Sequence, residues 1–296
     1  MSSRYGFLGG IALLVLAVLT GIASGKPASR VGGCQLFPHS NAWNQRVDNL
    51  PVAGNSDRLV RRMGPGEDLF ADFSIPYTTV GKNQRKERVR FDYRDESDKG
   101  PYPIPDNVPI EHGSDRHALI VDRDRCRLYE LYDLSRDGGR WSAGSGAIWN
   151  LHSNRLRPRG WTSADAAGLP ILPGLVRWDE VKRGAIHHAI RFTADETGGR
   201  FIYPARHDQG GDRGLPPMGL RMRLKAGVNI SHFSRQAQVI LRALKQYGMI
   251  LADEGKAWFI SGAPSEHWSD NALESLHQVK GSDFEVVNTR SLGRPH

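Results

Sequence analysis

GWTSADAAGLPILPGLVRWDEVKRGAIHHAIRFTADETGGRFIYPAR, residues 160–206, is the stretch around which the rest of the chain is organised. It begins as a polar loop, passes through an apolar run interrupted by Pro and Gly, and then concentrates polar side chains. These are His187, His188, Arg191, Tyr203, Arg206 and, directly after the stretch, His207. Such a concentration is typical either of a catalytic groove or of a hydrogen-bonded polar core.

Residues 185–193 and 200–204 are predicted to be two strands joined by a short turn. Because side chains alternate across a strand, the histidine doublet is expected to divide between two faces. His187 shares its face with Arg191, whereas His188 lies among apolar side chains and is either a buried imidazole or a functional group. Across the hairpin, the first face is expected to meet Tyr203, Arg206 and His207.

Short apolar runs bounded by turn residues continue along the rest of the chain. The predicted strands are 88–93 and 220–226, with hairpins formed by 117–122 with 126–133 and by 249–253 with 257–262. Ser234 is expected to cap one helix, and Ser269 or Asp270 a second, shorter one. The pattern predicts a mainly-β (α+β) fold, with a single-domain β-sandwich or jelly-roll-like core over residues 34–287 and two helices near the C-terminus.

The first 25 residues have the pattern of a signal peptide. Arg4 supplies a positive charge, residues 7–22 are apolar, and the small residues at 23–25 suit cleavage. An uncleaved anchor is the alternative, but the apolar run is shorter than the roughly 20 residues of a spanning helix. We therefore expect a secreted or periplasmic protein with no membrane span after signal removal, a linker at 26–33 and a flexible tail at 288–296.

Cys34 and Cys126 are the two cysteines of the chain. In an exported protein an even number of cysteines predicts a disulfide, with two separate buried thiols as the alternative. His187, His207 and Asp208 contain metal-ligating groups, but no HExxH or similar spacing accompanies them. Neither a metal nor a cofactor is expected.

The formal net charge of +8 favours an anionic partner. The basic residues are dispersed and accompany no nucleic-acid-binding motif, so nucleic acid is not expected. A polysaccharide, either anionic or neutral, is the expected partner, and an ordinary solvated basic surface is the alternative interpretation of these charges. The sequence leaves the oligomeric state open.

The Tyr, His and Arg side chains of the opening stretch contain the groups needed for β-elimination from a uronic acid. That reaction requires a cation at the carboxylate, a base for the C5 proton and an acid for the leaving oxygen. Glycoside hydrolysis would instead require two carboxylates roughly 5–10 Å apart. Indole rings could stack on sugar rings. The predicted substrate-binding residues are Trp161, Asp165, Trp178, Glu180, Asp115 and His117.

Five segments resemble a family of exported bacterial proteins of uncharacterised activity: 161–181, 187–193, 216–226, 240–255 and 280–287. A second similarity is to the β-jelly-roll polysaccharide lyases that cleave alginate. Their Gln-Ile/Val-His motif compares with Ala185-Ile186-His187, where the glutamine is absent. Their Lys-Ala-Gly-x-Tyr motif compares with residues 225–229, which end in Asn229 where the family has tyrosine. This resemblance implies polysaccharide cleavage on a β-sandwich.

Three hypotheses follow for the function. The first is an exported carbohydrate-active enzyme, a hydrolase or lyase that cleaves a polysaccharide in a His/Arg/Tyr-lined groove. The second is a non-catalytic protein that binds an envelope or extracellular polysaccharide in the same groove. The third is a structural exported protein whose polar cluster is internal.

Overall fold

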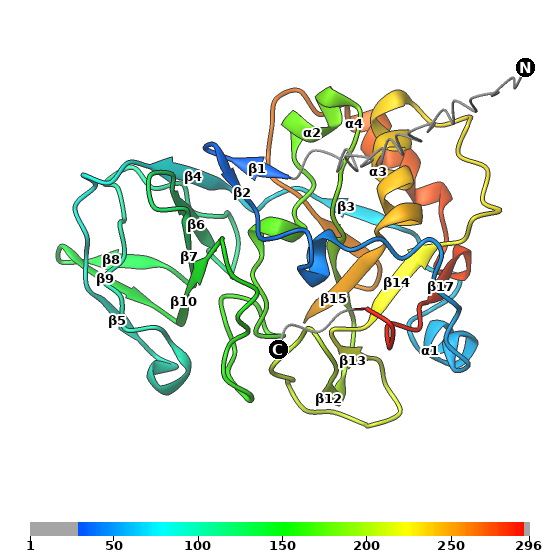
Figure 1. The fold of residues 1–296 in the computed structure, drawn as a ribbon, viewed down its shortest axis with the longest axis horizontal. Coiled ribbons are helices and arrows are strands. Elements are labelled where there is room, and N and C mark those ends of the chain that lie inside the picture. Colours follow the sequence, from blue (N-terminus) through cyan, green and yellow to red (C-terminus); the bar gives the residue numbers. More distant parts are fainter. Residues whose placement is uncertain (1–28, 293–296) are drawn as a thin grey trace, which may run out of the picture.

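The computed structural model describes residues 29–292, which form several small β-sheets and a few helices (Figure 1). Strands account for 28% of the described residues and helices for 17%, so the predicted mainly-β, α+β class is confirmed. Figure 1 shows the four- and three-stranded sheets at one end of the molecule and a six-stranded sheet with the principal helices at the other.

The six-stranded sheet has the order β17-β14-β15-β11-β16-β3. Its central strands are buried and apolar because both faces of the sheet are covered. The strands are β3 (Phe70–Asp72), β11 (Ile190–Ala194), β14 (Arg221–Leu224), β15 (Met249–Glu254), β16 (Phe259–Ser261) and β17 (Phe284–Val286). β11 runs parallel to β15, so the two strands end at the same edge of the sheet.

Four helices accompany this sheet: α1 (Ser56–Arg62), α2 (Trp178–Arg183), α3 (Arg235–Gln246) and α4 (Asp270–Glu274). The two helices predicted near the C-terminus are α3 and α4. The Ser234 hydroxyl accepts the Ala237 N–H, and Ser269 caps α4 in the same way, so both predicted caps are confirmed. Ala237, Ile240 and Leu244 on one side of α3 are buried in the core.

Two predicted hairpins are wrong. β12 (Gly198–Phe201) pairs with β13 (Pro217–Met218) and not with β11. β15 and β16 lie on opposite sides of β11, so residues 249–253 and 257–262 do not pair. The reason is the intervening segment: Thr197 donates its backbone N–H to Glu254 Oε1 (2.9 Å), and Ala257 donates to Asp195 Oδ1 (2.8 Å). The segment at residues 195–197 is therefore hydrogen-bonded to the segment at residues 254–257, and neither segment closes a hairpin between its own flanking strands.

The other sheets are built around the predicted hairpin of residues 117–133, which is confirmed as antiparallel β6 (Ala118–Asp122) and β7 (Arg127–Tyr132). β4 (Tyr77–Val80) and β10 (Ser145–Asn150) complete a sheet of order β10-β7-β6-β4. A three-stranded sheet of order β5-β9-β8 packs beside it. Its strands are β5 (Val89–Phe91), β8 (Ser135–Asp137) and β9 (Arg140–Ala143).

The ends of the described chain are attached to this body. Cys34 and Cys126 form the predicted disulfide. Residues 1–28, with the predicted signal peptide and the first three residues of the predicted linker, lie outside the described residues. The end of that linker forms β1 (Arg30–Val31), which pairs with β2 (Cys34–Gln35). In the predicted tail, the Asn288 N–H donates to Pro51 O (2.9 Å). Within residues 29–292, every helix is too short or too polar to span a bilayer.

Replacing both Cys34 and Cys126 with Ser should lower the free energy of unfolding by about 2–4 kcal/mol. The disulfide joins residues 92 positions apart, and its removal returns conformational freedom to the unfolded chain. Urea unfolding of the variant and of oxidised wild type gives the difference. Wild type treated with a reductant is the control and should match the variant, and a loss below about 0.5 kcal/mol would contradict the expectation.

Candidate functional site

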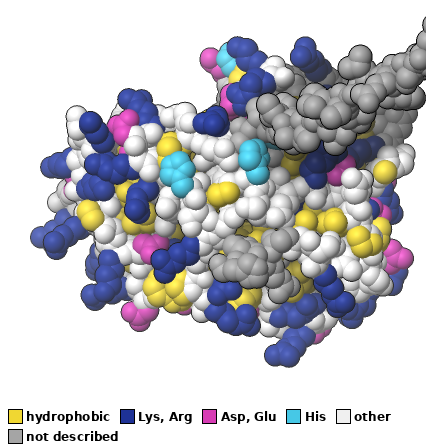
Figure 2. Space-filling view, in the orientation of Figure 1, with side chains coloured by type: hydrophobic (Ala, Val, Ile, Leu, Met, Phe, Trp, Pro, Cys, Tyr) yellow, Lys and Arg dark blue, Asp and Glu magenta, His cyan; other side chains and the backbone are white. Residues whose placement is uncertain are grey.

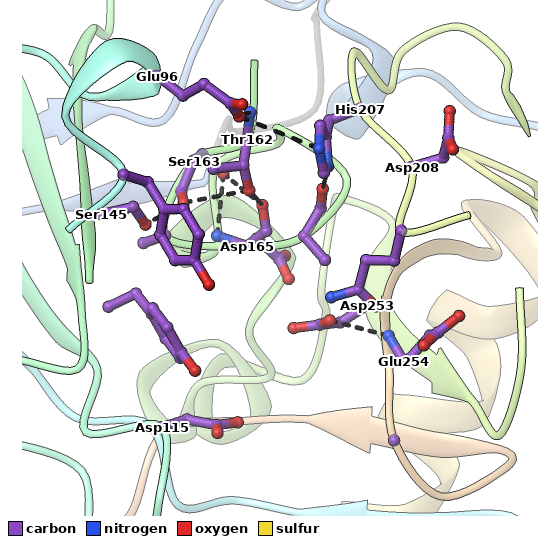
Figure 3. A pocket seen from close by; sticks show the side chains of 16 residues that line it. Glu96, Asp115, Ser145, Thr162, Ser163, Asp165, His207, Asp208, Asp253 and Glu254 are labelled. Atoms are coloured by element: carbon purple, nitrogen blue, oxygen red, sulfur yellow. Dashed lines mark hydrogen bonds and ion pairs between the residues drawn. The ribbon is translucent and has the colours of Figure 1, made fainter. Parts of the chain in front are cut away.

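A cavity of about 750 Å³ opens between the six-stranded sheet and the two sheets beside it (Figure 3). Its acidic lining residues are Glu96, Asp115, Asp165, Asp208, Asp253 and Glu254. Tyr93 and Tyr132 add aromatic surface, and His207 is the basic side chain of the lining, which contains no Lys or Arg. These residues come from the segment after β5, from β7, β10 and β15, and from separate loops, so the cavity exists only in the assembled fold.

Asp165 belongs to a tightly bonded loop, residues 162–166, that forms one wall of the cavity. Its N–H donates to Ser163 Oγ (2.9 Å), and Ser163 Oγ in turn donates to Leu169 O. The Ser145 hydroxyl at the start of β10 donates to Ser163 O. The loop is thus held by its own serines and by the four-stranded sheet.

Arg191 lies behind this wall and joins two carboxylates of the cavity. Its Nε and Nη2 atoms donate to the two oxygens of Asp165 (2.9 and 2.8 Å), and Nη2 also donates to Asp253 Oδ2 (3.0 Å). Nη1 donates to Ser261 Oγ on β16 (2.7 Å). Arg191 is 5% exposed and Asp165 1% exposed, so the guanidinium fixes both carboxylates from inside the protein.

Asp253 has the most altered acidity in the cavity. Burial raises the pKa of Asp253 to about 8, and the negative charge of Asp165 adds to that rise, while Arg191 opposes it. The Asp253 side chain remains 17% exposed, at the end of β15. Because its pKa is raised, this carboxyl keeps its proton to a higher pH than an ordinary aspartate does, and it is suited to donate a proton to a group bound in the cavity.

His207 and Glu96 stand together at another edge of the cavity (Figure 3). His207 Nδ1 lies 2.8 Å from Ala166 O, to which it donates because a carbonyl oxygen only accepts. Its Nε2 atom is 4.0 Å from Glu96 Oε2, which accepts the Thr162 N–H (2.8 Å). This pair places a carboxylate and an imidazole away from the Asp253 carboxyl.

A buried histidine, His117, supports the same wall. His117 Nε2 lies 3.0 Å from Ala164 O, and Nδ1 lies 2.5 Å from Glu111 Oε2. Both ring nitrogens therefore face acceptors, which favours the doubly protonated ring. Burial opposes that charge, but the hydrogen bond and negative charge of Glu111 prevail and raise the pKa of His117 above its usual value. Burial likewise opposes the ionised form of Glu111, yet His117 lowers the Glu111 pKa.

The His117–Glu111 pair should stabilise the protein most between about pH 4.5 and 6.5, the ordinary pKa values of the two groups. The Glu111 contribution, from a lowered pKa, is lost as pH falls. The His117 contribution, from a raised pKa, is lost as pH rises through that raised value. Glu111→Gln should therefore cost about 1–2 kcal/mol near pH 5.5 and less near pH 9, as measured by urea unfolding.

The matched control for this experiment is Glu87→Gln, because Glu87 pairs with the exposed side chain of Arg85. That change should alter the free energy of unfolding by less than about 0.5 kcal/mol at both pH values. An equal loss for Glu111→Gln at the two pH values would show that the ionic pair with His117 has no pH-dependent role.

The buried carboxylate Glu130 anchors the segment that follows the wall. It accepts the N–H groups of Ile171 (2.9 Å) and Leu172 (2.9 Å) and the Trp149 indole N–H (3.1 Å). Burial raises the pKa of Glu130 to about 7. Through these bonds Glu130, which is on β7, holds the apolar part of residues 160–206 in place. None of the three partners lines the cavity, so the role of Glu130 is structural.

The structure does not bring the six predicted catalytic side chains into one groove. Of these, His207 lines the cavity and Arg191 lies directly behind its wall. His187 packs edge-on against Tyr247, Tyr203 borders a separate void of about 20 Å³, and Arg206 donates to Arg157 O. The prediction that these groups face one another across a hairpin is wrong because β11 and β12 do not pair.

His188 is a core histidine, which is the first of its two expected alternatives, although it precedes β11 and strand alternation does not place it. It is fully buried, with Nε2 3.0 Å from Glu180 Oε2 and Nδ1 2.7 Å from Ala189 O. Burial opposes ionisation of Glu180, but the charges of Arg177 and His188 lower the Glu180 pKa to about 2. His188 and Glu180 therefore belong to a polar core beneath α2 and not to the cavity.

The predicted substrate-binding residues are also divided between several places. Asp115 and Asp165 line the cavity, and His117 supports its wall. Trp161 packs beside the Arg157 guanidinium (5.5 Å), and Trp178 packs edge-on against Trp268 (5.3 Å) beside another hollow. Three of the six predicted residues are thus associated with one site.

Sequence reasoning missed Asp253, Glu96 and the two tyrosines of the cavity. Asp253 ends an apolar run, and polar groups that follow buried parallel strands commonly form sites. That signal was obscured because residues 249–253 resembled one arm of a hairpin. Among residues 29–292, no three His, Cys, Asp or Glu side chains are grouped so as to hold a metal ion.

A scan against models of known protein families, and searches of curated proteins and of solved structures, found no match to this chain.

Proposed function

We propose that the protein is a carbohydrate-active hydrolase that cleaves a polysaccharide in the cavity between the sheets, with Asp253 as the general acid. The observation that carries the proposal is the position of the Asp253 carboxyl, which lines the cavity, accepts a hydrogen bond from Arg191 Nη2 (3.0 Å) and has a pKa raised by burial to about 8. Cleavage of a glycosidic bond requires such a proton donor at the leaving oxygen. The paired Asp165 and Arg191 hold the donor in place.

A second carboxylate completes this chemistry, and we assign Glu96 to that role. Figure 3 shows Glu96 and Asp253 at different sides of the cavity. The Thr162 N–H fixes one Glu96 oxygen, and His207 lies beside it. In a hydrolase the second carboxylate either attacks the sugar or activates a water molecule. Glu96 is suited to the role because its side chain is 35% exposed and opens to solvent.

The aromatic side chains of the lining fit a sugar ligand. Tyr93 is 57% exposed, which is unusual for a large ring, and Tyr132 lies in the same cavity. An aromatic face packs well against the C–H groups of a sugar ring. These two rings supply apolar contact, while the surrounding carboxylates supply hydrogen-bond acceptors for sugar hydroxyls.

The charge of the lining favours hydrolysis over elimination. A lyase acting on uronic acid needs a cation beside the substrate carboxylate. The lining contains six acidic side chains, of which Asp253 holds its proton most firmly, and no Lys or Arg, and the Arg191 guanidinium already binds Asp165 and Asp253. Uncharged or amino sugars therefore suit the cavity better than uronates do. Binding of a polysaccharide without cleavage is the alternative.

We place this activity outside the cytoplasm. The Cys34–Cys126 disulfide is compatible with an oxidising compartment, where such bonds persist. The signal-peptide pattern of residues 1–25 supports export.

The proposal is tested by incubating the purified protein with neutral, amino and uronate polysaccharides. Release of reducing ends without unsaturated products is expected from a neutral or amino polysaccharide. Unsaturated products would identify a lyase and contradict the proposed chemistry. Binding of a polysaccharide in the cavity with no product from any polymer would select the non-catalytic alternative.

A further inference from the structure

The three-stranded sheet β5-β9-β8 carries a cluster of exposed cations. We define the basic face as the exposed side chains of Lys86, Arg88, Arg90 and Arg140; Arg136 lies opposite Trp141 in register and packs over that ring on the inward side. Residues 85–92 and 135–140 together contain six Lys or Arg and three Asp or Glu. Figure 2 shows Lys and Arg side chains gathered over the end of the molecule that carries these strands.

Strand alternation creates this face. Val89 and Phe91 on β5 and Trp141 and Ala143 on β9 pack into the core cluster beneath the sheet. The intervening residues, such as Arg90 and its register partner Ser142, therefore point the other way. Arg88 and Arg90 are two positions apart on an extended strand, so their side chains project about 7 Å from each other. Repeated cations at such intervals fit a polymer with repeated anionic groups.

Few local anions neutralise the basic face. Glu87 pairs with Arg85, and Asp106 pairs with Arg136 at 3.3 Å. Asp137 lies opposite Arg140 in the register of β8 and β9, and exposed Asp92 follows Arg90 by two positions, so two carboxylates stand among the four cations of the face. An excess of positive charge remains on the face, whereas the cavity lining is acidic. The two surfaces thus select groups of opposite charge.

We propose that the basic face binds an anionic polysaccharide. Its aromatic residues, Phe91 and Trp141, pack inward, whereas single-stranded nucleic acid is bound by outward aromatic rings. Outward positions hold Ser142 and arginines, without the apolar side chains that insert into a membrane surface. These features favour a polysaccharide over the other two polyanions.

The basic face is continuous with the cavity. β5 leads directly to Tyr93, whose N–H donates to Gly144 O (2.9 Å) and whose ring lines the cavity. A polymer lying along β5 therefore reaches the cavity mouth. Delivery of the polymer from the basic face to the cavity rests on the proposed function. It implies a substrate in which anionic groups alternate with uncharged or amino sugars. Binding to the basic face itself does not depend on cleavage.

The test compares two variants with equal changes of charge. Arg88→Glu/Arg90→Glu/Arg140→Glu reverses the basic face. Arg58→Glu/Arg61→Glu/Arg62→Glu reverses three exposed arginines of α1, at the other end of the molecule (Figure 1). Binding of immobilised polygalacturonate is measured for both and for wild type at low and high salt, with dextran as the neutral polymer. Thermal unfolding checks that each variant folds.

Wild type should bind polygalacturonate and not dextran, with an affinity that falls as salt rises. The basic-face variant should lose about tenfold or more in affinity, and the α1 variant less than about twofold. If both variants lost affinity for polygalacturonate equally, the binding would depend only on the net charge of the protein, and the proposal would be overturned. Tighter binding to duplex DNA or to phosphatidylglycerol vesicles than to polygalacturonate would overturn the assigned partner. Absence of glycan cleavage, with binding retained, would contradict the proposed hydrolase and not the basic face.

Discussion

Replacing Asp253 with Asn should lower kcat on the cleaved polysaccharide by about 10²–10⁴-fold. Asparagine keeps the size of the side chain and an acceptor for Arg191, but it has no proton to give to the leaving oxygen. The wild-type rate should also fall as pH rises through about 8, because Asp253 loses its proton there. The measurement is the release of reducing ends across pH by both proteins.

Two further asparagine variants are the controls for this experiment. Asp208→Asn changes another carboxylate of the cavity lining, and Asp137→Asn changes an exposed carboxylate on β8. Both should keep activity within about tenfold of wild type. If Asp253→Asn keeps more than a tenth of the wild-type rate, Asp253 is not the general acid.

Replacing Arg191 with Met should lower the free energy of unfolding by about 3–5 kcal/mol. The guanidinium binds both oxygens of Asp165 and one of Asp253, and Asp165 is 1% exposed. Removing the cation leaves a buried carboxylate without its charged partner, and the side chain on β11 loses its bond to Ser261. Urea unfolding near pH 7 measures the loss.

Arg62→Met is the matched control, because Arg62 is exposed on α1 and its loss should cost less than about 0.5 kcal/mol. The triple variant Arg191→Met/Asp165→Asn/Asp253→Asn should regain part of the stability, because it removes the unpaired carboxylates with the cation. A loss below about 1 kcal/mol in Arg191→Met would mean that the two carboxylates do not depend on this arginine.

Local sequence patterns predicted the elements whose contacts are local. The β6–β7 hairpin and the α3 helix with its Ser234 cap are confirmed, because a short turn or a single capping hydroxyl determines each. The Cys34–Cys126 disulfide followed from the even cysteine count and the expected export. Strand order did not follow, since β11 takes partners about 60 residues away along the chain.

The candidate site was predicted in part for the same reason. The opening stretch does supply Asp165 and Arg191, which form the centre of the site with Asp253. The parallel pairing of β11 and β15 brings Asp253 close to Arg191, and no local sequence pattern predicts that these two strands pair. Similarly, Glu96 joins the cavity through a bond to Thr162, 66 residues further along the chain. Other polar side chains of the opening stretch face the protein interior and hydrogen-bond to one another, as His188 does with Glu180, so they do not reach the cavity.

A ¹³C NMR titration of the aspartate side-chain carboxyls tests the central claim most directly, with the Asp253 resonance assigned by its absence in Asp253→Asn. Because Asp165 and Asp253 interact, the pair is followed together across pH. If Asp253 is the proton donor of the cavity, its resonance should titrate with an apparent pKa of about 8. A resonance that titrates near the ordinary aspartate value of about 4 would contradict the assignment of Asp253 as a proton donor at neutral pH.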